Sequence, residues 1–416
     1  MNILKKHQNK IIILVLLEFF CGIFCPCFSQ KKSKDTQGVV MNPQIIENYI
    51  DELLQNSTAE IPAWNIEKAR SGRKSGWDYI DGCMIMAILE IYKLTNNKKY
   101  LDFADYYEDF RINEDGSIDS YNIETWNVDE INGAKNLFTL YELTGKEKYR
   151  KAIEPFYKQI RYQPRTKDGN FWHKMVYPNQ VWLDGLYMAQ PFYMEYEVKF
   201  NQSKNIDDIY QQFFNVYKFM RDEKTGLYYH CYDSSRKAFW ADKKTGLSKN
   251  FWLRALGWFS MALLDTLTIA QDKDSDNYKE LNRIFLELME SMIKFQDKSG
   301  MWYQLPALPN EKGNYLETSG SSIMAYCMLK GVRLGILPEK FQENGKKAFE
   351  GVCNTYLTTD NGKLSLDGIC LVAGLGPESN PKRDGTVAYY FSEPIVKDDA
   401  KGVGPFLLAY SEWKNL

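Results

Sequence analysis

The strongest constraint on the fold of this chain is a repeat of paired helix patterns. The segment IYKLT at residues 91–95, which precedes a Lys-Tyr pair, returns as LYELT at residues 140–144, again before a Lys-Tyr pair. Weaker copies follow near residues 196, 264 and 332. In each copy an apolar run ends, a short polar turn follows, and a second run begins with apolar residues at i, i+3 and i+4. A repeat with a period of about 50 residues predicts a series of helical hairpins.

A second repeat lies between these hairpins. In it, a glycine opens a short aromatic or β-branched segment, at Gly76, Gly116, Gly169, Gly226, Gly300 and Gly362. Helices that must each bury one face can close into a ring with an inner and an outer layer. We therefore predict an all-α fold, an (α/α)6 barrel of six helical hairpins with aromatic loops at one rim. An open solenoid is the alternative, because the sequence does not show whether the ring closes.

The first 40 residues differ from the rest of the chain. Lys5, Lys6 and Lys10 precede an apolar stretch at residues 11–28, and a small-x-small cleavage site follows. We predict a signal peptide at residues 1–29, a linker at residues 30–40 and a single barrel domain at residues 41–416. A membrane anchor is the less favoured alternative, because the apolar stretch is short and broken. The protein would be exported, to a periplasm if the source is Gram-negative, with an extracellular or surface-anchored location as alternatives.

Charge and cysteine content argue against several classes of protein. The formal net charge is −2 and no basic run occurs, so we expect no nucleic acid partner. Three of the eight cysteines lie in the predicted signal, and the other five are scattered without a CxxC pair. That pattern argues against a disulfide framework and against a zinc site. We expect no metal and no cofactor.

Two aspartates are candidates for chemistry. Asp184 lies among three aromatic residues at the start of an apolar helical run. It could cap that helix, or it could be a partly desolvated acid that donates a proton, with Trp182 beside it as a contact for substrate. Asp129 has the corresponding position at the start of the preceding inner helix. Ordinary glycosidases use two carboxylates, so this pair is a candidate for glycoside chemistry.

Two histidines and a Trp-Arg-Trp cluster are candidates for substrate binding. His173 and His230, the only histidines outside the predicted signal, both lie in aromatic loops of the predicted rim. Trp252, Arg254 and Trp258 lie together at the start of a later helix. A guanidinium group between indole rings suits a carboxylate ligand, because it makes bidentate contacts and stacks on rings. Aromatic faces also hold pyranose rings, so we expect an acidic sugar as substrate.

Five ordered blocks of the chain carry a resemblance to a known family. They are HK at residues 173–174 with YP at 177–178, WLDGLYM at 182–188, WLRALGW at 252–258, NYLETSG at 314–320, and YFSEPIV at 390–396 with KGVG at 401–404. With these blocks the chain resembles the unsaturated glucuronyl and galacturonyl hydrolases of glycoside hydrolase family 105, which is related to family 88. The resemblance runs from about Trp77 to the C-terminus. It implies an (α/α)6 barrel, in agreement with the repeats.

The resemblance also implies a reaction. These enzymes remove the 4,5-unsaturated uronic acid that polysaccharide lyases leave at the non-reducing end of their products. Asp184 matches the family's catalytic acid, which protonates C4 of the enol ether; water then adds at C5 and the hemiketal collapses. Asp129 matches the second aspartate, and the positions that match substrate contacts are His173, His230, Trp252, Arg254 and Trp258. The partner implied is an unsaturated oligosaccharide, with this protein acting downstream of a polysaccharide lyase.

The sugar behind the uronate stays open from sequence. Rhamnose from rhamnogalacturonan and sulfated rhamnose from ulvan are both options, and a sulfate would need cationic groups such as Lys174, Arg236 and Arg383. Two rival functions also stay open. One is a non-catalytic carbohydrate-binding barrel, and the other is a polysaccharide lyase of the same fold that would use Tyr229 and His230.

Overall fold

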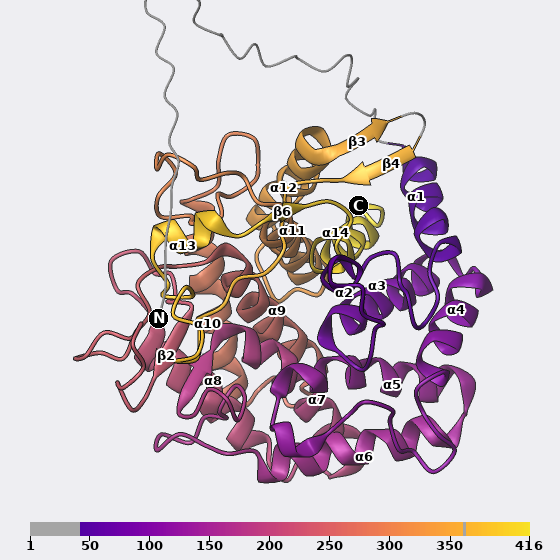
Figure 1. Ribbon diagram of the computed structural model, residues 1–416, viewed down its shortest axis with the longest axis horizontal. Coiled ribbons are helices and arrows are strands. Elements are labelled where there is room, and N and C mark those ends of the chain that lie inside the picture. The colour runs from indigo at the N-terminus through magenta and orange to yellow at the C-terminus, as the bar shows by residue number, and fades with distance from the viewer. Residues whose placement is uncertain (1–41, 361–362) are drawn as a thin grey trace, which may run out of the picture. The chain divides into compact units, whose positions relative to one another are not determined.

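The computed structural model describes residues 42–360 and 363–416 (Figure 1). The predicted signal peptide and linker, and Gly362 of the glycine repeat, lie outside the described residues. Within them, no helix combines the length and the apolar character needed to cross a bilayer.

The described part of the chain is mainly helical, with an inner and an outer layer. The inner layer consists of α3 (Tyr79–Thr95), α5 (Ile131–Thr144), α7 (Leu183–Phe200), α9 (Leu253–Ile269), α11 (Thr318–Arg333) and α14 (Ala400–Trp413). The outer layer consists of α1 (Pro43–Gln55), α4 (Lys98–Asp109), α6 (Glu147–Tyr162), α8 (Ile206–Met220), α10 (Asp276–Ile293) and α12 (Lys340–Tyr356). Two short helices, α2 (Ile66–Ser71) and α13 (Val387–Ser392), lie in connections.

The inner helices form a closed ring. Each packs against the next in chain order, and the last, α14, packs against the first, α3. This closure confirms the predicted (α/α)6 barrel and excludes the alternative prediction of an open solenoid. Five hairpins are consecutive, whereas the sixth pairs helices from the two ends of the described chain. In it, Tyr410 of α14 donates a hydrogen bond to the carbonyl of Pro43 in α1 at 3.3 Å, and Lys414 pairs with Glu47 at 2.6 Å.

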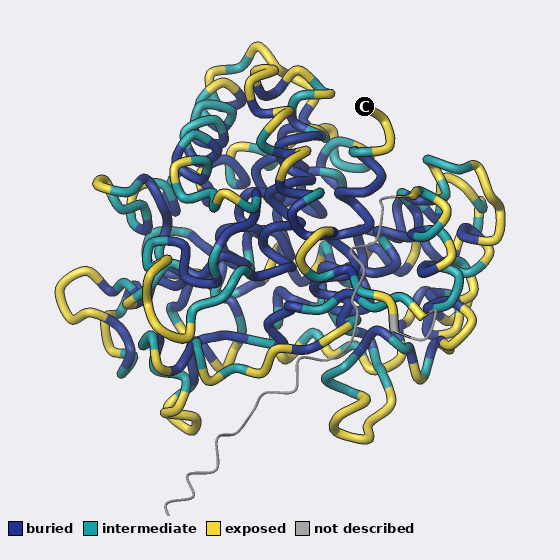
Figure 2. The backbone as a smooth tube through the Cα atoms, turned by 90° about the horizontal axis from the view of Figure 1, so that it is seen from above, coloured by how far each residue is buried: buried dark blue, intermediate teal, exposed yellow. Residues whose placement is uncertain are grey.

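Residue patterns explain which helix lies in which layer. Every residue of α9 from Leu253 to Leu267 is buried, as expected of a helix with neighbours on all sides. In α10, the buried residues repeat at helical spacing, for example Leu281, Ile284, Phe285 and Leu288, so one face meets the core and the other meets water. Figure 2 shows the resulting distribution, with buried backbone at the centre and exposed backbone in the peripheral turns.

Glycine turns shape four of the loops that lead from an outer helix to the next inner helix, whereas Gly76 of the predicted repeat does not have a positive φ. Gly116, Gly169, Gly226 and Gly300 all have φ between 74° and 99°, a region that glycine adopts without strain. Two of these loops pair through β1 (Gln180–Trp182) and β2 (Cys231–Asp233), which are antiparallel with Trp182 opposite Cys231. The pairing brings the loops of the two predicted histidines side by side.

Two further strand pairs lie after α12. Strands β3 (Leu357–Asp360) and β4 (Lys363–Leu366) form one antiparallel pair, and β5 (Ile369–Cys370) and β6 (Ile395–Val396) form another. The segment between β5 and β6 contains α13 and crosses the same rim as β1 and β2. It therefore supplies a second wall for the site described below.

Close helix packing in the ring predicts the effect of one substitution. A Cβ atom on Gly82 of α3 would lie 2.8 Å from the Cα atom of Gly133 in α5, so the two backbones would have to separate. We expect Gly82→Ala to lower the free energy of unfolding by about 1–3 kcal/mol, despite the higher helix propensity of alanine. Urea denaturation would measure it. Gly345→Ala in α12 is the control, because the atoms nearest to its new Cβ belong to the side chains of Leu329 and Met328, and it should lower the free energy of unfolding by less. A Gly82→Ala variant that is more stable than the wild type would contradict the expectation.

Candidate active site

A pocket of about 200 Å³ opens at the rim where the inner helices begin. Four of the predicted site residues line it, namely Asp129, His173, Trp182 and Asp184. The other lining residues are Glu67, Tyr79, Lys174, Tyr177, Met188, Val372, Ala373 and Arg383. Across the described residues, no group of three His, Cys, Asp or Glu side chains is arranged to hold a metal ion.

Asp184 lies in the first turn of α7 but does not cap it. The N-cap residue is Trp182, and no side chain accepts a capping hydrogen bond at this helix end. One carboxylate oxygen, Oδ2, instead lies 3.2 Å from Nε2 of His230. His230 is completely buried, and its Nδ1 lies 2.8 Å from the hydroxyl of Tyr390. The ring of His230, which is hydrogen-bonded to Tyr390, therefore lies against Asp184, although neither Asp184 Oδ2 nor His230 Nε2 has a hydrogen-bond partner among the described residues.

Asp129 is also not a helix cap. It lies in a short 3-10 turn, η2 (Val128–Glu130), before α5, whose N-cap residue is Glu130. Its Oδ2 lies 2.6 Å from Nζ of Lys174, and its Oδ1 lies 3.3 Å from Nε2 of His173. Burial alone would raise the pKa of Asp129, but Lys174, by its charge and its hydrogen bond, and His173 together hold that pKa below its usual range. Asp129 is therefore an ionised carboxylate with a fixed counter-charge.

A third carboxylate, which the sequence did not reveal, lines the same pocket. Glu67 comes from α2 and pairs with Nζ of Lys401 at 2.7 Å, while the fully buried Lys401 also contacts Asp399 at 3.1 Å. Burial would raise the pKa of Glu67, but the charge of Lys401 lowers it overall. Among the described carboxylates of the pocket, Asp184 is thus the one without a lysine or arginine partner. Lys401 lies in the KGVG block, yet nothing in the sequence linked that block to a short helix near residue 67.

Stacked aromatic rings form one wall of the pocket. The ring of His173 stacks on Trp182 with centroids 4.5 Å apart and planes at 6°, and Tyr177 stacks on the same indole at 4.8 Å. Gly185 makes room for this stack, because a Cβ there would lie 2.8 Å from Nδ1 of His173. Burial lowers the pKa of His173 to about 4, so its imidazole is neutral at physiological pH.

Four predicted substrate-binding residues do not line the pocket. His230 lies behind Asp184, and Trp252 packs against His230 with ring centroids 4.8 Å apart. Trp258 stacks on Tyr187 inside the barrel at 5.0 Å. Arg254 is 2% exposed and donates to the backbone carbonyls of Cys370 and Leu371. Their placement differs from the prediction because the interior of the ring buries the tryptophans, and backbone carbonyls at the end of β5 bind the guanidinium group.

Another arginine lines the pocket instead. Arg383 lies in the segment between β5 and α13 and is half-buried at the pocket wall. It forms no ion pair with any other described residue, whereas Lys174 is paired with Asp129 and Arg236 is exposed elsewhere. Sequence reasoning named Arg383 only as a possible sulfate contact. Its position suits an anionic group on a ligand.

The buried, neutral His173 predicts how stability depends on pH. A histidine in the unfolded chain takes up a proton near pH 6.5, whereas His173 in the folded protein does so near pH 4. Between these values the unfolded state binds more protons, so the free energy of unfolding should fall as the pH falls from 6.5 to 4, by up to about 3 kcal/mol from this residue. Urea denaturation at pH 7 and pH 5 would measure the fall. His173→Gln should show a smaller fall over the same range, and an equal fall would contradict the assignment.

Comparisons with known proteins agree with this geometry. A family model described as Glycosyl Hydrolase Family 88 matches residues 49–416. A protein of Agrobacterium fabrum is 39% identical over 230 residues, which are 54% of this chain and 97% of that protein. The unsaturated rhamnogalacturonyl hydrolase of Bacillus subtilis is 23% identical over 264 residues, covering 62% of this chain and 72% of that enzyme.

A solved structure gives the same result over almost the whole chain. The family 105 glycoside hydrolase of C. acetobutylicum is 44% identical and superposes with a TM-score of 0.82, covering 90% of this chain and 99% of that one. These matches confirm the resemblance predicted from the five sequence blocks. The chain belongs to Glycosyl Hydrolase Family 88, together with its relatives of family 105, and is a glycosidase that acts in carbohydrate degradation.

Proposed function

We propose that this glycosidase removes a 4,5-unsaturated uronic acid from the non-reducing end of oligosaccharides produced by polysaccharide lyases, by hydrating the enol ether. The observation that carries the proposal is the state of the three pocket carboxylates. Asp129 and Glu67 are each held by a lysine, at 2.6 Å and 2.7 Å. Asp184 remains as the acid able to exchange a proton with a substrate.

This arrangement favours one-acid chemistry over ordinary glycoside hydrolysis. A two-carboxylate mechanism needs a second acid as base or nucleophile. Asp129, the sequence's candidate for that role, has a lowered pKa and a lysine on one oxygen, so it is a weak base. Hydration of an enol ether needs a single group that first donates a proton to C4 and then takes one from the water that attacks C5. The hemiketal formed at C5 then opens, and the C1 oxygen bond to the next sugar breaks with release of that sugar.

The surrounding residues have separate tasks in this proposal. His230, hydrogen-bonded to Tyr390 through its other ring nitrogen, packs against the Asp184 carboxyl group and limits its movement. Trp182, fixed by its stack with His173 and Tyr177, offers an apolar surface to the sugar ring. The Asp129–Lys174 pair can accept from and donate to ring hydroxyl groups. Arg383 takes the role that sequence reasoning gave to Arg254 and binds the uronate carboxylate.

The sugar behind the uronate and the place of action are also part of the proposal. We favour rhamnose, because a relative at 23% identity is an unsaturated rhamnogalacturonyl hydrolase. A sulfated rhamnose from ulvan is the second candidate. With the predicted signal peptide, the enzyme would meet these oligosaccharides after export, in a periplasm, downstream of a lyase.

The assay of the proposed reaction follows the ultraviolet absorbance of the conjugated enol ether. The full-length protein should remove this absorbance from lyase-generated oligosaccharides of rhamnogalacturonan or of ulvan, and the set that responds identifies the aglycone. Asp184→Asn, which keeps the shape of the side chain but carries no acidic proton, should lower the rate by about 10²–10⁴-fold or more. Circular dichroism would check that the variant is folded. Full activity in Asp184→Asn would reject the mechanism, and no activity of the folded wild type on either set would favour a carbohydrate-binding role.

Arg383 allows a separate test of carboxylate recognition. Loss of a charge-assisted bidentate contact costs about 1.5–3 kcal/mol, so Arg383→Gln should reduce kcat/KM by about 10-fold to 100-fold, mainly through KM. Lys382→Gln changes the charge of an exposed neighbour and is the matched control. An equal kcat/KM in the two variants would mean that a residue other than Arg383 binds the uronate carboxylate.

A further inference from the structure

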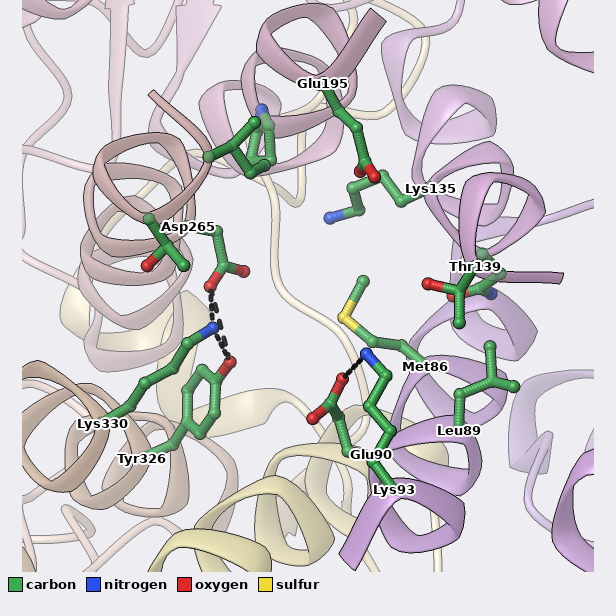
Figure 3. Close-up of a pocket in the computed structure, with 14 residues that line it drawn as sticks. Met86, Leu89, Glu90, Lys93, Lys135, Thr139, Glu195, Asp265, Tyr326 and Lys330 are labelled. Atoms are coloured by element: carbon green, nitrogen blue, oxygen red, sulfur yellow. Dashed lines mark hydrogen bonds and ion pairs between the residues drawn. The ribbon is translucent and has the colours of Figure 1, made fainter. Parts of the chain in front are cut away.

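A second pocket lies at the opposite end of the barrel. It is lined by residues from the later turns of the inner helices, including Glu90 and Lys93 of α3, Thr139 of α5, Glu195 of α7, Asp265 of α9 and Lys330 of α11 (Figure 3). Glu195 follows Asp184 by three helical turns of α7, a rise of about 16 Å along that helix. The volume of this far pocket is about 180 Å³.

Most charges of the far pocket are neutralised in pairs. Lys330 lies 2.8 Å from Asp265 and 2.6 Å from the hydroxyl of Tyr326, and Lys93 lies 2.6 Å from Glu90. Figure 3 shows both pairs on the pocket wall. Glu195 pairs at 2.8 Å with Lys199, one turn further along α7.

One cation of the far pocket has no such partner. Lys135 is 6% exposed, and its Nζ contacts the carbonyl oxygen of Tyr187 at 3.2 Å and the ring of Tyr187 at 3.2 Å from the centroid. No carboxylate of the described residues lies within ion-pair distance of it. Burial lowers the pKa of Lys135 to about 7, although Asp265 and Glu195 act in the opposite direction from further away. The amine extends from α5 into the pocket (Figure 3), where the counter-charge that the protein omits could be supplied by a ligand.

We propose that the far pocket binds a small hydroxylated carboxylate, such as a single sugar acid, whose carboxylate pairs with Lys135. Its hydroxyl groups would meet the paired charges and the Thr139 hydroxyl, and its carbon skeleton would contact apolar wall residues such as Met86 and Pro191. The small volume fits one such unit, since pockets for drug-sized ligands measure about 300–1,000 Å³. This site is separate from the candidate active site and does not depend on the proposed function.

Chemical labelling of the wild-type, full-length protein tests the proposal at the residue itself. Formaldehyde with cyanoborohydride methylates free amines, and peptide mass spectrometry gives the rate at each lysine. Galacturonate at about ten times its dissociation constant should slow methylation of Lys135 by about 10-fold. Galactose, which has the same ring without the carboxylate, should leave the rate unchanged. Lys98, with 80% of its side chain exposed, is the internal reference.

The outcomes separate the far pocket from the candidate active site. Protection of Lys135 by galacturonate alone, retained in Arg383→Gln, supports a distinct carboxylate site. Equal protection by galactose, or no protection by either sugar, would overturn the proposal. Protection that disappears in Arg383→Gln would assign the effect to the active-site pocket and would also overturn it.

Discussion

The packing of α14 against α3 is the contact on which the rest of the structure depends. It joins the two ends of the inner layer, so that six helices begin at one rim and end at the other. Without closure, the loops that follow the outer helices would be spread along a solenoid. With closure, the loop of His173 and the segment before α13 face one another across a single pocket. The loop of His230 pairs with the loop of His173 through β1 and β2.

Within that pocket, the arrangement of charge decides the chemistry. A carboxylate that is removed from water needs a compensating partner, and the buried Asp129 and the half-buried Glu67 have theirs in Lys174 and Lys401. Asp184 has a histidine instead, supported by a tyrosine hydroxyl. A group that must give and take a proton cannot be held in one charge state by a fixed lysine, so the absence of such a partner at Asp184 has a functional consequence.

The far pocket, at the other end of the barrel, also contains one charged group without a partner of opposite charge, but here that group is a cation. There the carboxylates have lysine partners, and the remaining group is a lysine. A buried cation without a counter-ion is costly, which its lowered pKa of about 7 reflects. Each pocket thus contains ionisable side chains that no described lysine, arginine or carboxylate pairs with, namely Asp184 and Arg383 at one end and Lys135 at the other.

The sequence by itself determined the helical hairpins, the barrel and the family, because these depend on periodic apolar residues and on ordered local motifs. It also named Asp184, Asp129, His173 and Trp182 as candidate site residues, and all four line one pocket. Only the tertiary structure decided which arginine reaches the pocket. The sequence favours Arg254 for a carboxylate and offers Arg383 only as a possible sulfate contact, but backbone carbonyls at the end of β5 bind Arg254, and Arg383 lies at the pocket wall. Glu67 and Lys401 are 334 positions apart in the chain, and Lys135 lies in an ordinary helical segment. Their roles depend on which groups the closed ring places beside them, and no local pattern carries that information.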